Sequence, residues 1–370
     1  MDCVHYFSGR CRSCALMGQP YAAQVSEKER SVRALLPASV TWAPSITGPE
    51  HGFRNKAKMV VTGTVAAPVL GIADRAGVGV DLRDCGLYEP DLGNSFDVLA
   101  RFVTLAGVTP YDVGERRGEL KYLLVTVAPG GALMARFVLR STESLLRIRK
   151  HLPALLAWLP QLAVVSVNLQ PEHKAVLEGP EEIVLHGESL TMRVNGLDLH
   201  LRPQSFFQTN TEIAAALYRQ VADWVAEAAP NRMWDLYCGV GGFALHCAAP
   251  DREVVGVEVS AEAIASARLS AAALPGALEF VAADATAWAQ RQVTAAELVV
   301  VNPPRRGTGT ELAGWLECSG VETVVYSSCN ATTLARDLEQ MPSLVPMRAR
   351  LLDMFPQTPH YEVVTLLRRR

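Results

Sequence analysis

The stretch Trp234-Asp-Leu-Tyr-Cys-Gly-Val-Gly-Gly-Phe243 decides the fold of this chain. It begins with the apolar residues of a buried strand and ends in the glycines of a turn that opens a helix. Gly239, Gly241 and Gly242 permit positive φ angles and let the backbone approach a ligand closely. Such turns bind nucleotide cofactors, although a tight strand–helix turn without a ligand has a similar composition. The stretch therefore predicts a strand–turn–helix unit with a candidate cofactor site.

Short apolar runs alternate with helical stretches from about residue 195 onward. Each run is followed by a polar or Gly/Pro-rich turn, and the runs cover residues 233–237, 254–259, 278–282, 298–301 and 323–327. Strands that alternate with helices predict an α/β fold with a doubly wound parallel sheet. We expect a Rossmann-like catalytic domain over residues 196–370, with ligands at the carboxyl ends of its strands.

Acidic residues at the ends of the next strands indicate which cofactor the turn binds. Glu258 ends the second strand, 19 residues after Gly239, where a carboxylate accepts both ribose hydroxyls. Asp284 ends the third strand, where an acid would contact an adenine. A dinucleotide site stays open, because Gly239, Gly241 and Ala244 approximate Gly-x-Gly-x-x-Gly. Two further features favour S-adenosylmethionine: Asp235 at the strand end, and Asn302-Pro-Pro after the fourth strand.

A cysteine follows the fifth strand, in Tyr326-Ser-Ser-Cys-Asn-Ala-Thr-Thr-Leu-Ala335. Cys329 would lie at the start of a helix, whose partial positive charge stabilises a thiolate. A buried structural cysteine is the alternative, but the polar setting at the ligand-binding end of the sheet favours a nucleophile. Cys247 and Cys318 lack such a setting, and we interpret both as structural.

Glu362 stands between Tyr361 and the apolar run Val363-Val-Thr-Leu-Leu367. A carboxylate beside so much apolar surface is either paired or raised in pKa, as a general base requires. A solvent-facing carboxylate at a sheet edge is the alternative. Glu362 as a general base and Cys329 as a nucleophile together predict covalent catalysis.

The first half has a different pattern, with strands and helices in no regular alternation. Two apolar runs, Leu120–Val127 and Leu133–Leu139, flank a Pro-Gly-Gly turn and predict a hairpin. The further expected elements are helices over 25–36 and 145–159, the second with a possible break at Pro153, and strands over 58–62, 69–72 and 163–169. We expect a smaller α+β domain over residues 1–195 that binds RNA.

Four cysteines, Cys3, Cys11, Cys14 and Cys85, lie in this first half with the spacing C-x7-C-x2-C and a distant fourth. Four thiolates suit structural zinc or a [4Fe–4S] cluster, and the spacing does not distinguish them. They predict a cysteine knuckle over residues 1–20 completed by Cys85.

Composition sets the broad class. The net charge is −3, with 49% hydrophobic and 20% charged residues, as in ordinary globular enzymes. No apolar run approaches the roughly 18 residues that cross a bilayer, and no signal-peptide pattern begins the chain, so we expect a cytoplasmic protein without a membrane partner. Residues 101–150 hold nine lysines and arginines against four acids. The candidates for phosphate contacts are Arg54, Lys56, Lys58, Arg117, Lys121, Arg136 and Arg140.

The chain resembles the RNA (uracil-C5) methyltransferases over nearly its whole length. The blocks that carry the resemblance are 205–210, 235–243, 302–307, 328–330 and 353–362 in the second half, and 52–58, 117–121 and the cysteine-rich start in the first. Within that family it resembles the branch that methylates uracil 747 of 23S ribosomal RNA.

The resemblance implies a class I S-adenosylmethionine-dependent methyltransferase. It implies that Cys329 is the nucleophile, that Glu362 is the base, and that the four cysteines bind a [4Fe–4S] cluster. The cofactor-contacting positions that it implies are Gln208, Tyr237, Glu258 and Asn302. Asn302 departs from the Asp of many relatives. The implied substrate is a uridine of 23S ribosomal RNA in a hairpin loop or flipped from its stack.

Three alternatives remain open. A relative with the same site modifies transfer RNA. A cytosine-C5 methyltransferase also forms a cysteine adduct, but places its carboxylate elsewhere. A catalytically silent iron–sulfur RNA-binding protein is the alternative from another class, against which the joint presence of Cys329, Glu362 and Glu258 argues. No obligate protein partner is evident.

Overall fold

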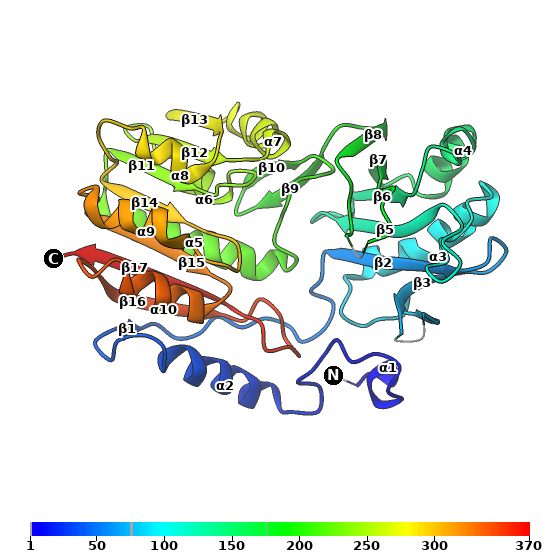
Figure 1. Ribbon diagram of the computed structural model, residues 1–370, viewed down its shortest axis with the longest axis horizontal. Helices are drawn as coiled ribbons and strands as arrows, with labels where there is room; N and C mark the ends of the chain where they lie inside the picture. Colours follow the sequence, from blue (N-terminus) through cyan, green and yellow to red (C-terminus); the bar gives the residue numbers. More distant parts are fainter. Residues whose placement is uncertain (1, 75–76, 175) are drawn as a thin grey trace. The chain divides into compact units, whose positions relative to one another are not determined.

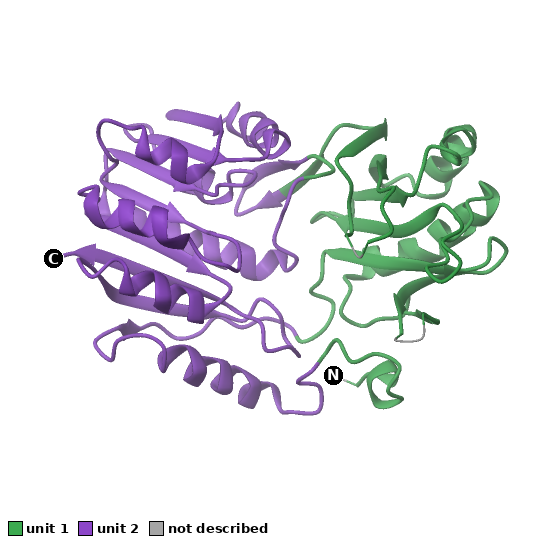
Figure 2. Ribbon diagram, viewed as in Figure 1, with its two compact units in different colours: residues 1–14, 50–192, 202–204 green, residues 15–49, 193–201, 205–370 purple. Residues whose placement is uncertain are grey.

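The computed structural model describes residues 2–74, 77–174 and 176–370, which form two compact units (Figures 1 and 2). Unit 1 consists of residues 1–14, 50–192 and 202–204. Unit 2 consists of residues 15–49, 193–201 and 205–370. Both units are therefore built from segments that are separate in the sequence.

Unit 1 contains a seven-stranded sheet in the order β4-β3-β2-β5-β6-β7-β8. All neighbouring strands are antiparallel except β6 and β7, which are parallel. The strands are β2 (Lys56–Gly63), β3 (Pro68–Ala73), β4 (Gly79–Asp81), β5 (Leu120–Val127), β6 (Leu133–Leu139), β7 (Leu162–Leu169) and β8 (Glu181–His186). The helices are α1 (Val4–Phe7), α3 (Pro90–Leu105) and α4 (Leu145–Trp158).

One face of this sheet carries the core of unit 1. Alternate residues of β2, namely Ala57, Met59 and Val61, are buried in a cluster with apolar residues of α3 and α4. Side chains alternate between the two faces of a strand, so Lys58 and Val60 lie on the opposite face. The two helices thus cover one face, and the other carries polar and aromatic side chains.

Helix α4 runs through Pro153 without a break, so the possible interruption that the sequence suggested at this proline is absent. Ile148 and Leu155 on either side of the proline are both buried in the same core, which holds the helix together across it. Among the helices of the described residues, none is both long and apolar enough to cross a membrane.

Unit 2 contains an eight-stranded sheet in the order β1-β16-β17-β15-β14-β11-β12-β13. Neighbouring strands in this sheet are parallel, except that β17 is antiparallel to both β15 and β16. The strands are β1 (Thr41–Trp42), β11 (Arg232–Leu236), β12 (Glu253–Glu258), β13 (Ala277–Ala282), β14 (Leu298–Val301), β15 (Thr323–Ser328), β16 (Leu344–Leu352) and β17 (Glu362–Arg369). The helices are α2 (Tyr21–Arg33), α5 (Thr211–Ala228), α6 (Gly242–His246), α7 (Ala261–Ala271), α8 (Ala285–Gln290), α9 (Gly309–Cys318) and α10 (Ala331–Glu339). A short hairpin of β9 (Leu190–Val194) and β10 (Leu197–Leu201) precedes α5.

The central strands of this sheet are buried on both faces. All four residues of β14 and all six of β15 are buried, as expected when helices cover a parallel sheet on both sides. The strand order reverses at β11, where chain connections turn to opposite sides. The α/β doubly wound prediction for the second half is confirmed.

Residues 15–49 belong to unit 2, whereas the sequence predicted one continuous domain over 1–195. Lys28 of α2 donates a 2.6 Å hydrogen bond to Asp353, and both side chains are buried. Gln24 of the same helix exchanges hydrogen bonds with Gln357. Strand β1 then pairs with β16 at the edge of the sheet. Buried polar partners from opposite ends of the chain therefore place α2 in unit 2.

Candidate active site

The carboxyl edge of the unit 2 sheet gathers the predicted chemistry. The turns after β11, β12, β14 and β15 lie at this edge because these strands are parallel. Strand β17 runs in the opposite direction, so its first residue, Glu362, lies at the same edge. Ser328, the last residue of β15, pairs with Val363 of β17. Cys329 directly follows Ser328 and Glu362 directly precedes Val363, so both residues lie next to this pair at the same end of the two strands. The sheet topology thus brings together the two residues that the sequence assigned to catalysis.

The glycine-rich turn after β11 has positive φ angles at two of the three glycines that permit them, and also at Tyr237. Tyr237, Gly239 and Gly241 have φ angles of 67°, 54° and 84°. A Cβ added at Gly239 would meet no atom within 4 Å, whereas one at Gly242 would lie 2.6 Å from the Tyr218 ring. Gly242 is therefore required for packing of α6, and Gly239 faces open space that a ligand can approach.

Asp235 lies beneath this turn. Its Oδ2 accepts a hydrogen bond of 2.9 Å from the Ala244 amide in the first turn of α6, and its Oδ1 has no hydrogen-bond partner among the described residues. Complete burial, against the opposing effect of the Ala244 bond and with a contribution from the nearby Glu258, raises the pKa of this carboxyl to about 7. Its bond to α6 makes Asp235 a positioning residue for the turn.

Glu258 faces the turn from the end of β12. Its two carboxylate oxygens accept hydrogen bonds from the backbone amides of Gly239 (3.3 Å) and Ser260 (3.0 Å). These bonds fix the carboxylate beside the open space at Gly239. Asp284, at the end of the third strand, is exposed and caps α8 by accepting a 2.8 Å bond from Ala287.

Gln208 and Asn302 come from two other segments of unit 2. Gln208 is buried in the segment before α5. This segment is tied down by Asn210, which caps α5 and donates to the Met354 carbonyl at 3.3 Å. Asn302 directly follows β14, and its backbone amide donates a 3.4 Å hydrogen bond to the carbonyl of Leu236 in β11. Asn302 therefore lies next to the glycine-rich turn.

Cys329 occupies the connection between β15 and α10. The helix begins at Ala331 with Asn330 as its N-cap, so Cys329 lies just before the cap. Half-burial raises the pKa of the Cys329 thiol, the Glu362 charge raises it further, and the Arg305 guanidinium lowers it. The net effect is a raised pKa, and Arg305 supplies the positive charge that opposes it.

Glu362 is buried, as its apolar sequence context predicted. Burial raises the pKa of its carboxyl to about 7. Ser327 donates a 2.6 Å hydrogen bond to Glu362 Oε1, and this bond lowers the pKa. The adjacent Tyr361 hydroxyl accepts a 3.2 Å bond from the Ala331 amide, which joins the start of β17 to α10. The solvent-facing alternative for Glu362 is wrong.

Sequence reasoning missed how the loop that carries Arg305 is held. Asp337 of α10 is buried and accepts hydrogen bonds from the Thr308 amide (2.7 Å), the Thr308 hydroxyl (2.9 Å) and the Tyr326 hydroxyl (2.8 Å). The Asn330 side chain donates to the Arg305 carbonyl at 3.3 Å. The sequence did contain a signal for a functional loop here. Two adjacent arginines stand in Asn302-Pro-Pro-Arg-Arg306, directly after a strand at the ligand edge.

The four N-terminal cysteines share one pocket in unit 1. Cys3, Cys11, Cys14 and Cys85 line a cavity of about 180 Å³. Burial, together with the charges of the other three thiols, raises the pKa of Cys14 to about 11. Over the part of the chain that the structure describes, no group of three or more His, Cys, Asp or Glu side chains meets the geometry for holding a metal ion.

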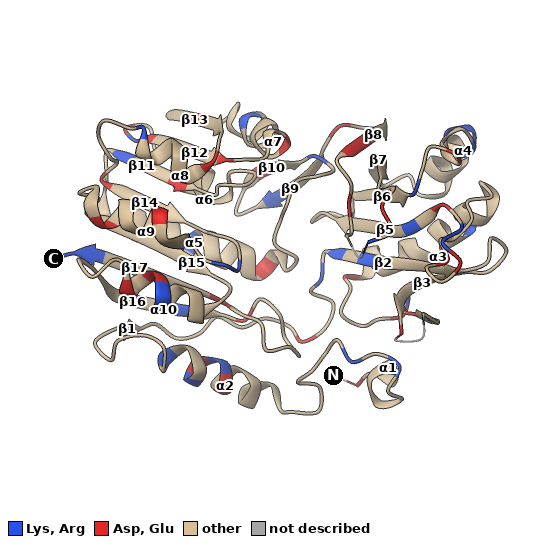
Figure 3. Ribbon diagram, in the orientation of Figure 1, with Lys and Arg blue, Asp and Glu red and all other residues tan. Residues whose placement is uncertain are grey.

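Several predicted phosphate contacts pair with groups inside unit 1 instead. Figure 3 shows basic positions on β2 and β5 of this unit and an acidic position on β8. Arg136 is buried and forms ion pairs with Glu178 (2.8 Å) and Glu182 (2.7 Å). The Lys121 ammonium bonds to oxygens of residues 170 and 172, and Arg140 pairs with Glu119. For Arg136 and Lys121 the prediction is wrong, because a long basic side chain can be buried when acceptors surround it. Lys58 and Arg117 are exposed.

The chain matches known proteins along its whole length. Residues 197–314 match the family model "Methyltransferase small domain" and residues 288–370 match "tRNA (Uracil-5-)-methyltransferase". It is 49% identical to the 23S rRNA (uracil(747)-C(5))-methyltransferase of Pectobacterium carotovorum, with 100% of each chain covered. It is 50% identical to the protein of the same name from Cronobacter sakazakii, again with 100% of each covered. The solved Pyrococcus abyssi tRNA (uracil-54, C5)-methyltransferase in complex with S-adenosyl-L-homocysteine superimposes with a TM-score of 0.81 at 25% identity, covering 96% of this chain and 85% of that one.

Proposed function

The chain belongs to the 23S rRNA (uracil(747)-C(5))-methyltransferase family, and from this premise we propose that it transfers a methyl group from S-adenosylmethionine to carbon 5 of uracil 747 in 23S ribosomal RNA. The product is 5-methyluridine. One observation supports the catalytic assignment above all others: Cys329 directly follows Ser328 and Glu362 directly precedes Val363, and these two residues pair across β15 and β17 at the ligand edge.

The residues around the glycine-rich turn fit S-adenosylmethionine. Glu258 is held by two backbone amides and would accept the ribose hydroxyls, and the open space at Gly239 would admit the ligand. Asp284 would face the adenine. The remaining positions proposed to line or support the site are Gln208, Asp235, Tyr237, Gly241 and Asn302. When bound, the cofactor supplies an electrophilic methyl group on a sulfonium.

Cys329 makes the uracil reactive. Carbon 5 of uracil is a poor nucleophile, so the Cys329 thiolate first adds to carbon 6, and the ring becomes an enolate with negative charge at carbon 5. The thiol must lose its proton for this step, and the Arg305 charge favours the thiolate. Carbon 5 would then take the methyl group from the sulfonium, and the electron pair of the broken S–CH3 bond would stay on sulfur, which leaves as a neutral thioether. Because Cys329 is only half-buried, a base that leaves its stack can reach it.

Glu362 completes the reaction. Its carboxylate removes the proton from carbon 5, the electron pair restores the 5,6 double bond, and the thiolate is expelled from carbon 6. A pKa of about 7 suits this role, since the group must be ionised to take the proton and must lose it before the next turnover. Ser327 keeps the carboxylate oriented.

The proposal is tested by incubating the purified protein with S-adenosylmethionine and unmodified 23S RNA, then mapping modified uridines by mass spectrometry. One 5-methyluridine at position 747 is expected. Methylation at another uridine would support the proposed methyl transfer to carbon 5 but reject uracil 747 as its target. Unmodified transfer RNA is the parallel substrate, because of the structural similarity to the P. abyssi tRNA enzyme. Methylation of transfer RNA alone would assign the chain to that substrate.

We also propose that Cys3, Cys11, Cys14 and Cys85 bind a [4Fe–4S] cluster. Four thiols line one pocket, and Arg54 lies beside them to offset the charge of thiolates. The group would tie the N-terminal segment to Cys85, some seventy residues away in sequence, and contribute to folding. Anaerobic purification should give absorbance near about 400 nm with iron and sulfide, lost in Cys11→Ser and kept in the matched Cys318→Ser. Stoichiometric zinc without iron would reject the cluster in favour of a zinc site.

A further inference from the structure

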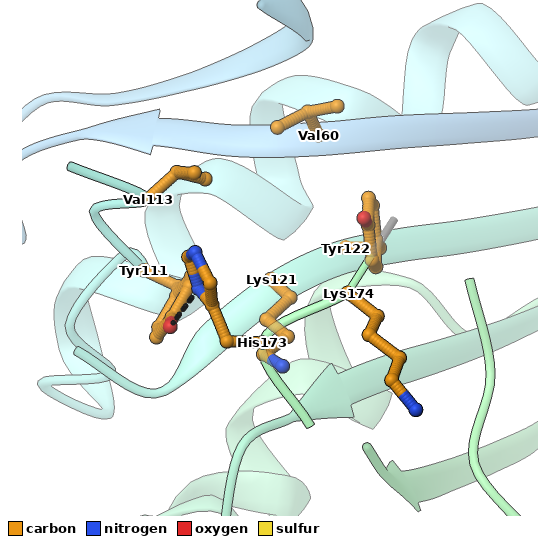
Figure 4. A pocket seen from close by; sticks show the side chains of 7 residues that line it. All are labelled: Val60, Tyr111, Val113, Lys121, Tyr122, His173 and Lys174. Carbon is orange, nitrogen blue, oxygen red and sulfur yellow. Dashed lines mark hydrogen bonds between the residues drawn. The ribbon is translucent and has the colours of Figure 1, made fainter. Parts of the chain in front are cut away.

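A second pocket opens on the helix-free face of the unit 1 sheet. It has a volume of about 190 Å³ and is lined by Val60, Tyr111, Val113, Lys121, Tyr122, His173 and Lys174 (Figure 4). Val60 of β2 and Tyr122 of β5 are register partners, so they lie side by side on the sheet and form one wall. In Figure 4, Tyr111 and His173 lie together to one side of them. The pocket is therefore mainly aromatic and apolar.

The wall opposite Tyr122 is held in place by hydrogen bonds. The Tyr111 hydroxyl and His173 Nδ1 are 3.0 Å apart. The Lys121 ammonium lies 4.9 Å from the centre of the Tyr111 ring and donates to the carbonyls of Gln170 and Glu172, each at 2.7 Å. Lys121 thus fastens the segment before His173 to β5. These contacts preform the pocket without a ligand.

The chemistry of the wall suits a nucleobase. Two tyrosine rings and an imidazole offer flat faces for stacking, which is how proteins hold unstacked bases. When the Tyr111 hydroxyl donates to Nδ1, the imidazole proton lies on Nε2, where it can donate to a base carbonyl. None of the seven lining residues is acidic, although Lys174 at the rim pairs with Glu172 at 2.6 Å. A polyanionic ligand is therefore tolerated here.

We propose that this pocket receives an unstacked nucleobase of the RNA substrate, distinct from the uracil that is methylated. The pocket is lined by residues of unit 1, and neither Cys329 nor Glu362 is among them, so its base is not the one that the proposed nucleophile attacks. The inference rests on the proposed function, which makes RNA the substrate. A hairpin loop can present two unstacked bases, whereas a continuous duplex cannot do so without melting. The pocket thus contributes to selection of the RNA structure.

The test measures RNA binding and contact directly. The full-length protein is mixed, at fixed salt concentration, with a fluorescent 23S RNA hairpin that contains uracil 747, and Kd is determined by anisotropy. Tyr122→Ala should weaken binding by about fivefold or more, since stacking on one aromatic side chain contributes that much per base. Tyr122→Phe keeps the ring and should bind within about twofold of the unchanged protein. Leu146→Ala, an exposed apolar change on α4 of the same unit, is the matched control and should have no effect.

Two further measurements separate the possible outcomes. Ultraviolet crosslinking of the unchanged protein to the same hairpin, with peptide mapping, should find RNA on Tyr111, Tyr122 or His173. His173→Ala, at an exposed position, should also weaken binding if Tyr122→Ala is misfolded. Crosslinks in the pocket without methylation would support this inference and reject the proposed function. Normal methylation with unchanged Kd in both alanine variants and no crosslink in the pocket would overturn the inference and leave the proposed function standing.

Discussion

The Ser327 hydroxyl donates a 2.6 Å hydrogen bond to Oε1 of Glu362. The two residues lie on the neighbouring antiparallel strands β15 and β17, and both are buried. Burial raises the pKa of Glu362 to about 7, and the Ser327 bond acts in the opposite direction by stabilising the carboxylate. Ser327 therefore positions the proposed base and keeps part of it ionised at neutral pH.

Replacement of Ser327 by alanine should shift the pH dependence of methylation. Glu362 acts as its carboxylate, so activity falls as pH falls through its pKa. Loss of the hydrogen bond raises that pKa, and the acid limb should move upward by about one pH unit. Single-turnover rates at saturating RNA between pH 5.5 and about 9 measure the shift. Ser327→Thr retains a hydroxyl and should restore the original limb. An unchanged limb in the alanine variant would show that the bond has no role in proton transfer.

The two catalytic residues should fail at different steps. Cys329→Ala removes the nucleophile and should abolish turnover without forming any covalent RNA complex. Glu362→Gln leaves addition and methyl transfer possible but blocks proton removal, so an RNA–protein adduct should accumulate. Denaturing gel electrophoresis with labelled RNA distinguishes the two. Cys318→Ser, an exposed cysteine outside the site, should behave as the unchanged protein. An adduct in Cys329→Ala would place the nucleophile elsewhere.

The regular parts of the fold were predictable from local patterns. The hairpin strands β5 and β6 have the bounds that Leu120–Val127 and Leu133–Leu139 predicted, because β-type runs flank a Pro-Gly-Gly turn. The parallel strands were found from their apolar runs, and their carboxyl ends located the turn, Cys329 and Asn302. Glu362 was assigned because the apolar run after it indicated burial. Hydrophobic periodicity and turn residues were sufficient to predict these strands and where the turn, Cys329, Asn302 and Glu362 lie along them.

Long-range partners were not predictable in the same way. Lys28 lies in the predicted helix over residues 25–36, and its neighbour Glu29 gives no sign that its acceptor, Asp353, stands 325 residues later. Arg136 looked like a surface cation, but Glu178 and Glu182 bury it. Ser327 was interpreted only as part of the polar setting of Cys329. In each case the decisive group is distant in sequence, and composition contains no information about the pairing.

Arg305 should set the reactivity of Cys329. Its positive charge lowers the thiol pKa against the effect of burial, so Arg305→Ala should raise that pKa and slow alkylation at pH 7.5. Arg305→Lys keeps the charge and should have a smaller effect. Glu362→Gln removes a negative charge that raises the pKa and should accelerate alkylation. Rates of iodoacetamide labelling of Cys329, followed by peptide mass spectrometry in a Cys318→Ser background, measure all three. Equal rates in Arg305→Ala and the unchanged protein would contradict the coupling.

The ion pair of Lys28 and Asp353 should stabilise unit 2. Both side chains are almost fully buried, at 3% and 0% exposure, so Lys28→Met would leave an unpaired carboxylate in the core. Breaking such a pair costs about 3–5 kcal/mol of the free energy of unfolding, measured by urea denaturation. The double variant Lys28→Met/Asp353→Leu removes both charges and should recover most of that loss. Arg30→Ala on the same helix breaks an exposed pair with Glu27 and should leave stability almost unchanged. Equal destabilisation by Lys28→Met and Arg30→Ala would show that burial of the pair has no energetic consequence, and α2 would then be held to unit 2 by its other contacts, including the hydrogen bonds between Gln24 and Gln357.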